Sequence, residues 1–277
     1  MSQRLIEFSK YYCCDNCGFL FIKRYDSEET IDSLKDHYQH VDPHERVSHS
    51  KKLFYTAVLD YLSSAVKREG KKILDVGCGY GYFLDMASSK GWEPNGIEVV
   101  QDAANSCRKK LGHGNVFKGK LGETNLPDRS FDAITLWDVI AIVDDPYDDI
   151  KECSRLLKKG GIIGIRTRNV LFQTFVYRLF NRIRQIAIRT NLKEPYVFNR
   201  FCFSSKAINA LLTRVGFVNI EIINSPLTSG DPYGHMGLQF PIKFTKYFLN
   251  IISKIIFRIS NGRLLIGPSL LIWAKKA

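Results

Sequence analysis

The stretch ILDVGCGYGYF at residues 73–83 constrains the fold of this chain more than any other part of its sequence. Before it, KKILDV has the short apolar run of a buried strand, and after it a helix is predicted over about 81–90. Three glycines, Gly77, Gly79 and Gly81, lie at the junction, where they permit a tight turn and let a ligand approach the backbone closely. The stretch therefore predicts a strand–turn–helix unit at a ligand site.

Strands and helices alternate along most of the remaining chain. This alternation predicts an α/β fold, a doubly wound parallel sheet with helices on both faces. We expect residues 1–50 to form a leader and residues 51–277 one domain with helical inserts at 169–200 and 225–265. Helices are predicted at about 51–69, 101–111, 145–158 and 204–215, and strands at NGIEVV, NVFKG, 131–139, 160–167, 217–223 and 269–276.

Two acidic residues narrow the choice of ligand. Glu98 ends the second predicted strand, where a carboxylate can accept hydrogen bonds from the ribose hydroxyls of an adenosine cofactor. Dinucleotide sites usually have GxGxxG, whereas this chain has GxGxG preceded by Asp75. An anion at this point repels a pyrophosphate and attracts a cation. It therefore favours S-adenosylmethionine, which carries an ammonium and a sulfonium, over a nicotinamide dinucleotide.

Several quoted stretches carry a resemblance to a known family. ILDVGCGYG, GIEVV, FDAITLWDVI with the following segment to GGIIGIRTRN, and FCFSSKAINALLTRVGFVNIEI resemble class I S-adenosylmethionine-dependent methyltransferases. Within that class, residues 50–225 resemble the group around the ubiquinone-biosynthesis O-methyltransferases. The resemblance implies a Rossmann-like sheet of seven strands with an antiparallel last strand. It also implies S-adenosyl-L-methionine as the cofactor and S-adenosyl-L-homocysteine as the product.

The resemblance also implies roles for individual residues. The glycine turn with Asp75, Gly77, Cys78 and Gly79 would hold the methionine part of the cofactor. Glu98 would bind the ribose, and Val99 would contact the adenine face.

At the tip of the fourth strand, Trp137 and Asp138 would border the mouth between cofactor and acceptor. Asp138 is thus one candidate catalytic residue, and His235, in the segment GDPYGHMG, is a candidate base. Tyr38, with His37, lies ahead of the first helix and is expected to cover the cofactor.

The chain departs from the group at two places. Where the group often has an acid that reaches the adenine amine, this chain has Lys120, so adenine recognition is expected to depend on Leu121 and backbone groups. Where the group often reads DVIEHV, this chain has Ala141 and Ile142 in place of the acid and the histidine. This second departure argues against a metal-assisted or histidine-based mechanism.

The N-terminal segment YYCCDNCGFLF contains Cys14-x-x-Cys17-Gly18, which resembles one knuckle of a zinc ribbon. A closed zinc site needs four ligands, and there is no second CxxC in the sequence. His37 and His40 follow at HxxH spacing, which leaves an unusual Cys2His2 site as the alternative. We predict free thiols and no bound metal.

The odd count of seven cysteines fits a reducing, cytoplasmic compartment, as does the lack of an apolar signal core at the N-terminus. Charge is strongly asymmetric: residues 1–150 hold 19 basic and 24 acidic residues, whereas residues 151–277 hold 21 and 4, giving −5 and +17. Such a split suggests an anionic partner or, alternatively, only a solvated face.

Two stretches, 169–190 and 240–260, have apolar stripes at helical spacing with basic residues beside them. Basic amphipathic helices of this kind suit the membrane interface, although both stripes could instead pack on the sheet or line a pocket.

Together these features predict a methyltransferase for a small or lipid-linked acceptor, acting at oxygen and in peripheral contact with an anionic membrane. The alternatives are an RNA methyltransferase, suggested by the basic half, and a protein that binds the cofactor without turnover. RNA is less favoured because the stripes lack aromatic residues interleaved with basic ones.

Overall fold

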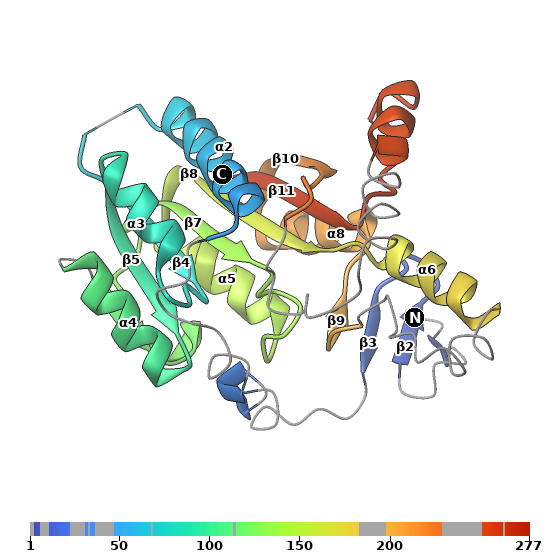
Figure 1. Cartoon of the computed structure of the whole chain (residues 1–277), viewed down its shortest axis with the longest axis horizontal. Helices are drawn as coiled ribbons and strands as arrows, with labels where there is room; N and C mark the ends of the chain where they lie inside the picture. Colours follow the sequence, from blue (N-terminus) through green and yellow to red (C-terminus); the bar gives the residue numbers. More distant parts are fainter. Residues whose placement is uncertain are drawn as a thin grey trace.

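The structure is a computed structural model. It describes residues 3–5, 11–22, 31–32, 34–36, 47–67, 69–112, 115–182, 198–228, 251–262 and 264–277. These residues are organised around one sheet of seven strands and one of four (Figure 1).

The large sheet has the strand order β10-β11-β8-β7-β4-β5-β6. Strands β4 to β8 pair in parallel, and β11 runs antiparallel to both of its neighbours. The predicted doubly wound sheet with an antiparallel last strand is therefore confirmed. Its strands are β4 (Lys71–Val76), β5 (Trp92–Glu98), β6 (Asn115–Lys118), β7 (Phe131–Trp137), β8 (Leu157–Arg168), β10 (Phe217–Asn224) and β11 (Ser269–Lys276).

Helices cover both faces of this sheet. One hydrophobic cluster joins the sheet to α2, α3 and α4, and another joins its opposite face to α5 and α8 (Figure 1). Because the central strands are buried on both sides, β4 and β7 are nearly continuous apolar runs. The helices are α2 (His49–Ala65), α3 (Tyr82–Ser89), α4 (Gln101–Leu111), α5 (Pro146–Leu156), α6 (Val170–Arg182) and α8 (Ser205–Val215).

Local capping sets the ends of several helices. The Ser48 hydroxyl accepts a hydrogen bond from the Lys51 N–H at 3.4 Å, so α2 begins two residues before the predicted start. Asp145 caps α5 in the same way, with Pro146 at the first helical position. Gly216 ends α8 in the left-handed conformation, at the end predicted for the helix over 204–215.

At one point β11 approaches β8 so closely that only glycine fits. Trp273 pairs with Gly164 in register, and a Cβ on Gly164 would lie 2.4 Å from the indole ring. We expect Gly164→Ala to lower the free energy of unfolding by about 1–3 kcal/mol, because overpacking displaces the ring. Urea unfolding measures this, with Gly122→Ala as the control, since no atom lies within 4 Å of that Cβ position. Equal stability of the two variants would contradict the expectation.

The N-terminal leader takes part in a second sheet, which the sequence did not predict. Strands β2 and β3 form a hairpin around the Cys14–Cys17 turn, and β3 pairs with β9, which follows the first insert. The sheet packs beside the start of α6, through Leu20, Cys202 and Val170 (Figure 1). Its strands are β1 (Gln3–Leu5), β2 (Tyr11–Cys14), β3 (Leu20–Ile22) and β9 (Phe201–Cys202).

Within the described residues, no group of three or more His, Cys, Asp or Glu side chains is arranged to hold a metal ion. The Cys14 thiol accepts hydrogen bonds from the N–H groups of Cys17 and Asn16, which lower its pKa. His37 and His40 lie outside the described residues, so the proposed completion of a zinc site by them is untested.

Both insert helices have exposed apolar rows at i, i+4 and i+8. On α6 the row is Leu171, Phe175 and Leu179, and on the helical segment 251–259 it is Ile251, Ile255 and Ile259. Both segments lie at the end of the molecule away from α3 and α4 (Figure 1). None of the described helices is both long enough and apolar enough to cross a membrane.

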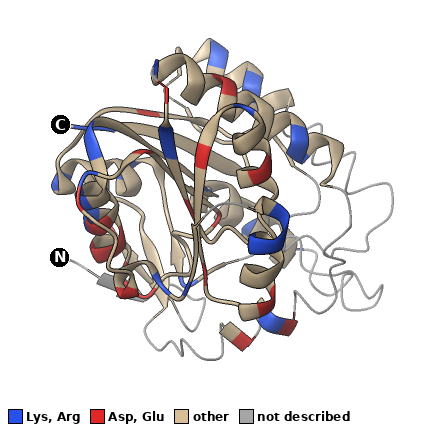
Figure 2. Ribbon diagram, turned by 90° about the vertical axis from the view of Figure 1, so that its left-hand side faces the viewer, with Lys and Arg blue, Asp and Glu red and all other residues tan. Residues whose placement is uncertain are grey.

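Figure 2 shows the ribbon from the end that carries α3 and α4. There, the described Lys and Arg residues are interspersed with Asp and Glu.

Candidate functional site

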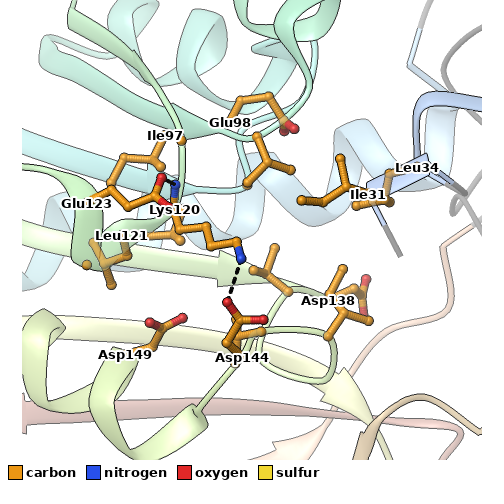
Figure 3. A pocket seen from close by; sticks show the side chains of 18 of the residues that line it. Ile31, Leu34, Ile97, Glu98, Lys120, Leu121, Glu123, Asp138, Asp144 and Asp149 are labelled. Atoms are coloured by element: carbon orange, nitrogen blue, oxygen red, sulfur yellow. Dashed lines mark hydrogen bonds and ion pairs between the residues drawn. The ribbon is translucent and has the colours of Figure 1, made fainter. Parts of the chain in front are cut away.

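A cavity of about 400 Å³ lies at the carboxyl ends of β4, β5 and β7 (Figure 3). The strand order reverses between β4 and β7, and open α/β sheets bind ligands at such a switch point. The cavity volume lies in the usual range for small-molecule sites, about 300–1,000 Å³. Six residues predicted from the sequence line it: Gly77, Glu98, Val99, Leu121, Trp137 and Asp138.

The glycine turn has the backbone that the sequence predicts. Gly77, Gly79 and Gly81 have φ values of 73°, 52° and 76°. A Cβ on Gly77 would lie 2.4 Å from Val139 Cγ2, so the turn and the loop after β7 meet at the floor of the pocket. Glycine is therefore required here both by the backbone conformation and by the close approach.

The N–H groups of this turn are largely used within the protein. Gly77 and Cys78 both donate to the Ile97 carbonyl, at 2.8 and 3.0 Å, and Gly79 donates to Glu98 Oε2 at 2.9 Å. These three N–H groups are therefore not the main contribution of the turn to ligand binding. Its main contribution is that a ligand can approach the backbone closely.

Glu98 links the turn to the next strand and helix. Its Oε2 accepts from Gly79 and its Oε1 accepts from the Val100 N–H, each at 2.9 Å. The side chain is almost fully buried and borders the cavity. A carboxylate can accept about four hydrogen bonds, so two backbone donors do not exhaust its capacity for ligand hydroxyls.

Asp75 lies beneath the turn and does not line the cavity. The Thr135 hydroxyl donates to its Oδ1 at 2.6 Å. Burial raises the pKa of Asp75 to about 7 and the Glu98 charge adds to this, while the Thr135 hydrogen bond and Lys51 oppose it. Its predicted contact with the methionine ammonium stays a prediction.

Cys78 and Gly79 also lie outside the cavity lining. The Cys78 thiol is buried and lies 3.8 Å from the Cys107 thiol, whose hydrogen bond with it, together with burial, raises the pKa of Cys78 well above its usual value. The Cys78 side chain packs the turn against Gly96 of β5. A Cβ on Gly96 would lie only 2.7 Å from the Cys78 sulfur, so glycine is needed for this contact.

Asp138 follows β7 at the mouth of the pocket and is held by Arg166, which no sequence motif identifies. Asp138 has a φ of 64°, in the left-handed region that costs most residues energy. Its N–H donates to the Arg166 carbonyl at 2.9 Å, and the Arg166 guanidinium donates to its Oδ2 at 2.7 Å. Arg166 is only 4% exposed and also donates to Ser225 Oγ at 3.1 Å.

Trp137 is fixed by aromatic neighbours from three other elements. Its ring makes edge contacts with Phe54, Phe83 and Trp273, at centroid distances of 5.4, 5.4 and 6.3 Å. The indole N–H is buried and has no hydrogen-bond partner within the described part of the chain. Rigid packing of this ring defines one wall of the pocket mouth.

Two apolar residues of the N-terminal leader, Ile31 and Leu34, close the cavity from the side of Glu98 (Figure 3). Leu34 packs with Tyr80, Val100 and Val99. A covering role was predicted for Tyr38, which lies outside the described residues, as does the candidate base His235.

Comparison with known proteins agrees with this geometry. The family described as "Methyltransferase domain" matches residues 47–222. That match spans well over half of the sequence, so the chain belongs to this family. The fold class and the S-adenosylmethionine-dependent class predicted from the sequence are thereby confirmed.

Individual relatives are more distant. The chain is 30% identical over 119 residues to a ubiquinone biosynthesis O-methyltransferase from Alkalilimnicola ehrlichii, a match covering 40% of this chain and 47% of that protein. The chain thus spans about half the length of this curated relative.

Solved structures with the same fold include a phosphoethanolamine N-methyltransferase 2 from Haemonchus contortus, with a TM-score of 0.58, 15% identity, and coverage of 93% of this chain and 61% of that one. Another is a geranyl diphosphate C-methyltransferase from Streptomyces coelicolor, with a TM-score of 0.51, 18% identity, and coverage of 85% and 86%. At these identities the likeness concerns the fold alone.

Proposed function

We propose that this chain transfers a methyl group from S-adenosylmethionine to an oxygen of a small acceptor. The observation that carries the proposal is the position of Glu98, which borders a cavity beside the glycine turn at the switch point of the sheet. The family match supports the reaction class, and the name of the curated relative supports oxygen as the acceptor atom.

The residues of the cavity fit the cofactor by chemistry and by space. When bound, the cofactor supplies a methyl group on a positively charged sulfur. Glu98 would accept the ribose hydroxyls, and the apolar side chains of Val99 and Leu121 would contact the adenine ring. Gly77 borders the cavity, and the methionine part would lie beside it along the glycine turn.

Methyl transfer is an in-line displacement, so positioning of the acceptor supplies most of what the protein can contribute. Asp138 projects from the pocket mouth with its orientation set by Arg166, and we assign it the task of holding the acceptor hydroxyl. His235 remains the proposed base.

The direct test is a transfer assay with methyl-labelled S-adenosylmethionine and fractionated small molecules and lipids from the source cells. A labelled product with an oxygen–methyl bond is the expected result. Calorimetry runs in parallel: binding of S-adenosylhomocysteine without transfer to any fraction would favour a cofactor-binding protein without turnover. Binding of NAD but not of S-adenosylhomocysteine would overturn the proposal.

We further propose that the acceptor is lipid-linked and is met at an anionic membrane surface. Support comes from the exposed apolar rows of α6 and of segment 251–259, where Phe175 is 57% and Ile255 is 50% exposed. Arg178 and Arg182 flank one row, and Lys254 and Arg258 flank the other, all four exposed. An apolar row with basic neighbours is the pattern of a helix lying at a membrane interface.

We expect the double variant Phe175→Asp, Ile255→Asp to lose about tenfold or more of its binding to vesicles of phosphatidylcholine and phosphatidylserine. The reason is that each carboxylate places a charge in the apolar layer. Cosedimentation measures this, with Val218→Asp as the matched control, because Val218 is an exposed apolar residue (43%) of strand β10. Wild-type binding should weaken with added salt. No vesicle binding by the wild-type protein would refute the membrane proposal and leave the transfer assay unaffected.

A further inference from the structure

The cavity is lined by five acidic side chains, and the protein itself engages four of them. Glu98 accepts from backbone N–H groups of Gly79 and Val100. Glu123 accepts from the Lys120 N–H at 2.8 Å. Asp138 is paired with Arg166, and Asp144 is paired with Lys120 at 2.6 Å. These carboxylates have structural partners that account for their positions.

The fifth, Asp149, is different. It lies in the first turn of α5 and is partly buried, yet within the described part of the chain its carboxyl group has no hydrogen bond or ion pair. Figure 3 shows this group between Leu121 and Asp144, on the lower side of the cavity. A partly buried carboxyl group without a partner is costly unless a ligand provides a donor.

The position of Asp149 identifies the end of the ligand that it would meet. Helix α5 packs against the turn that begins with Leu121, and Ile142 and Val143 complete an apolar slot there. Glu98 is hydrogen-bonded to the glycine turn through the Gly79 N–H, and Leu121 and Asp149 lie across the cavity from Glu98 (Figure 3). A cofactor with its methionine part at the turn and its ribose at Glu98 would therefore extend its adenine toward Asp149. Adenine has one strong donor, its exocyclic amine.

We propose that Asp149 accepts a hydrogen bond from the exocyclic amine of the cofactor's adenine and thereby selects an adenosyl group. This inference rests on the proposed binding of S-adenosylmethionine in this cavity. Either protonation state serves, because a carboxyl oxygen accepts the N–H in both.

The surroundings of Asp149 are consistent with such a role. Burial raises its pKa to about 7, and the neighbouring charges of Asp144, Asp145, Asp148 and Glu152 add to this. Carboxyl groups that lie in clefts and have a strongly shifted pKa are commonly functional.

The one basic side chain among the residues that line the cavity does not neutralise Asp149. Lys120 is directed to Asp144, whose other oxygen lies 3.3 Å from the Arg200 guanidinium. Arg200 also donates to the Val143 carbonyl at 3.0 Å, which holds this loop against the segment leading to β9. The Lys120 ammonium group is thus paired with Asp144 and not with Asp149, whose carboxyl group lies at the apolar slot.

The test compares two ligands by calorimetry: S-adenosylhomocysteine and its 6-deamino purine analogue, in which hydrogen replaces the amine. The wild-type protein is expected to prefer the first by about 10- to 100-fold, the range for a hydrogen bond to a charged or ionisable group. In Asp149→Ala this preference should fall below about threefold. Asp149→Asn should keep most of it, because the amide oxygen also accepts.

Asp148→Ala is the matched control, since Asp148 is its exposed neighbour in the same turn and lies outside the cavity lining. Thermal melts of all variants check folding. An undiminished preference in folded Asp149→Ala would overturn the inference while leaving cofactor binding intact. Failure of the wild-type protein to bind either ligand would instead overturn the proposed function, and this inference with it.

Discussion

Replacing Glu98 by alanine is expected to weaken S-adenosylhomocysteine binding by at least about 100-fold and also to destabilise the fold. Two separate losses contribute. The ribose hydroxyls lose a charged acceptor, and such hydrogen bonds contribute about 1.5–3 kcal/mol each. In addition, the Gly79 and Val100 N–H groups lose their acceptor, and a buried donor without a partner costs about 1–3 kcal/mol.

The measurements are calorimetric titration with S-adenosylhomocysteine and urea unfolding. Glu93→Ala is the matched control, because Glu93 lies on the same strand but forms an exposed pair with Lys72 at 3.1 Å. Exposed pairs contribute about 0–1 kcal/mol, so this variant should bind normally. Ligand affinity within threefold of the wild type in Glu98→Ala would show that this carboxylate does not hold the ribose.

The large sheet could be predicted because its determinants are local. Apolar runs such as KKILDV and periodic stretches such as the one that forms α8 identify their own elements, and repeated alternation of strands and helices favours a parallel sheet. The antiparallel last strand was predicted from the family resemblance and not from its own pattern.

The small sheet could not be predicted because it depends on distant pairing. Strand β9 has two residues, Phe201 and Cys202, whose partners in β3 lie about 180 positions earlier in the chain. No periodic pattern develops over so short a strand. The sequence motif indicates the Cys14–Cys17 turn, but it does not predict the β-hairpin that contains this turn.

The same distinction applies to the site. Gly77, Glu98 and Val99 belong to contiguous motifs, and the structure places them around the cavity. Arg166 was missed because its role depends on the register of two strands that pair Trp137 with Arg166.

Asp149 is one of four acidic residues in DDPYDDI, and the motif does not single it out. One feature of the sequence could nevertheless have indicated that its side chain points inward. Asp149 lies four residues before Cys153, which is fully buried, so helical spacing directs it inward. No comparable signal existed for Ile31 and Leu34, whose place over the cavity follows from the path of the leader.

A second large effect concerns pH. We expect the wild-type protein without ligand to lose about 2–3 kcal/mol of stability relative to Asp75→Asn between about pH 5 and pH 8. In the unfolded chain Asp75 ionises near its usual pKa of 3.8, whereas in the folded protein burial raises the pKa to about 7. As pH rises between these values, only the unfolded state releases the proton, so unfolding becomes more favourable. Above the folded pKa the penalty is complete and constant.

Urea unfolding of both proteins across this range measures the difference. The asparagine oxygen can still accept from Thr135, so the variant should fold. Asp85→Asn, at an exposed position of α3, serves as the control for removing one carboxylate and should show no such trend. Saturation with S-adenosylhomocysteine is expected to reduce the pH dependence, because its ammonium favours the ionised form of Asp75. A difference between wild type and Asp75→Asn that stays constant with pH would mean that Asp75 is ionised throughout. The turn would then tolerate a buried charge without the cofactor.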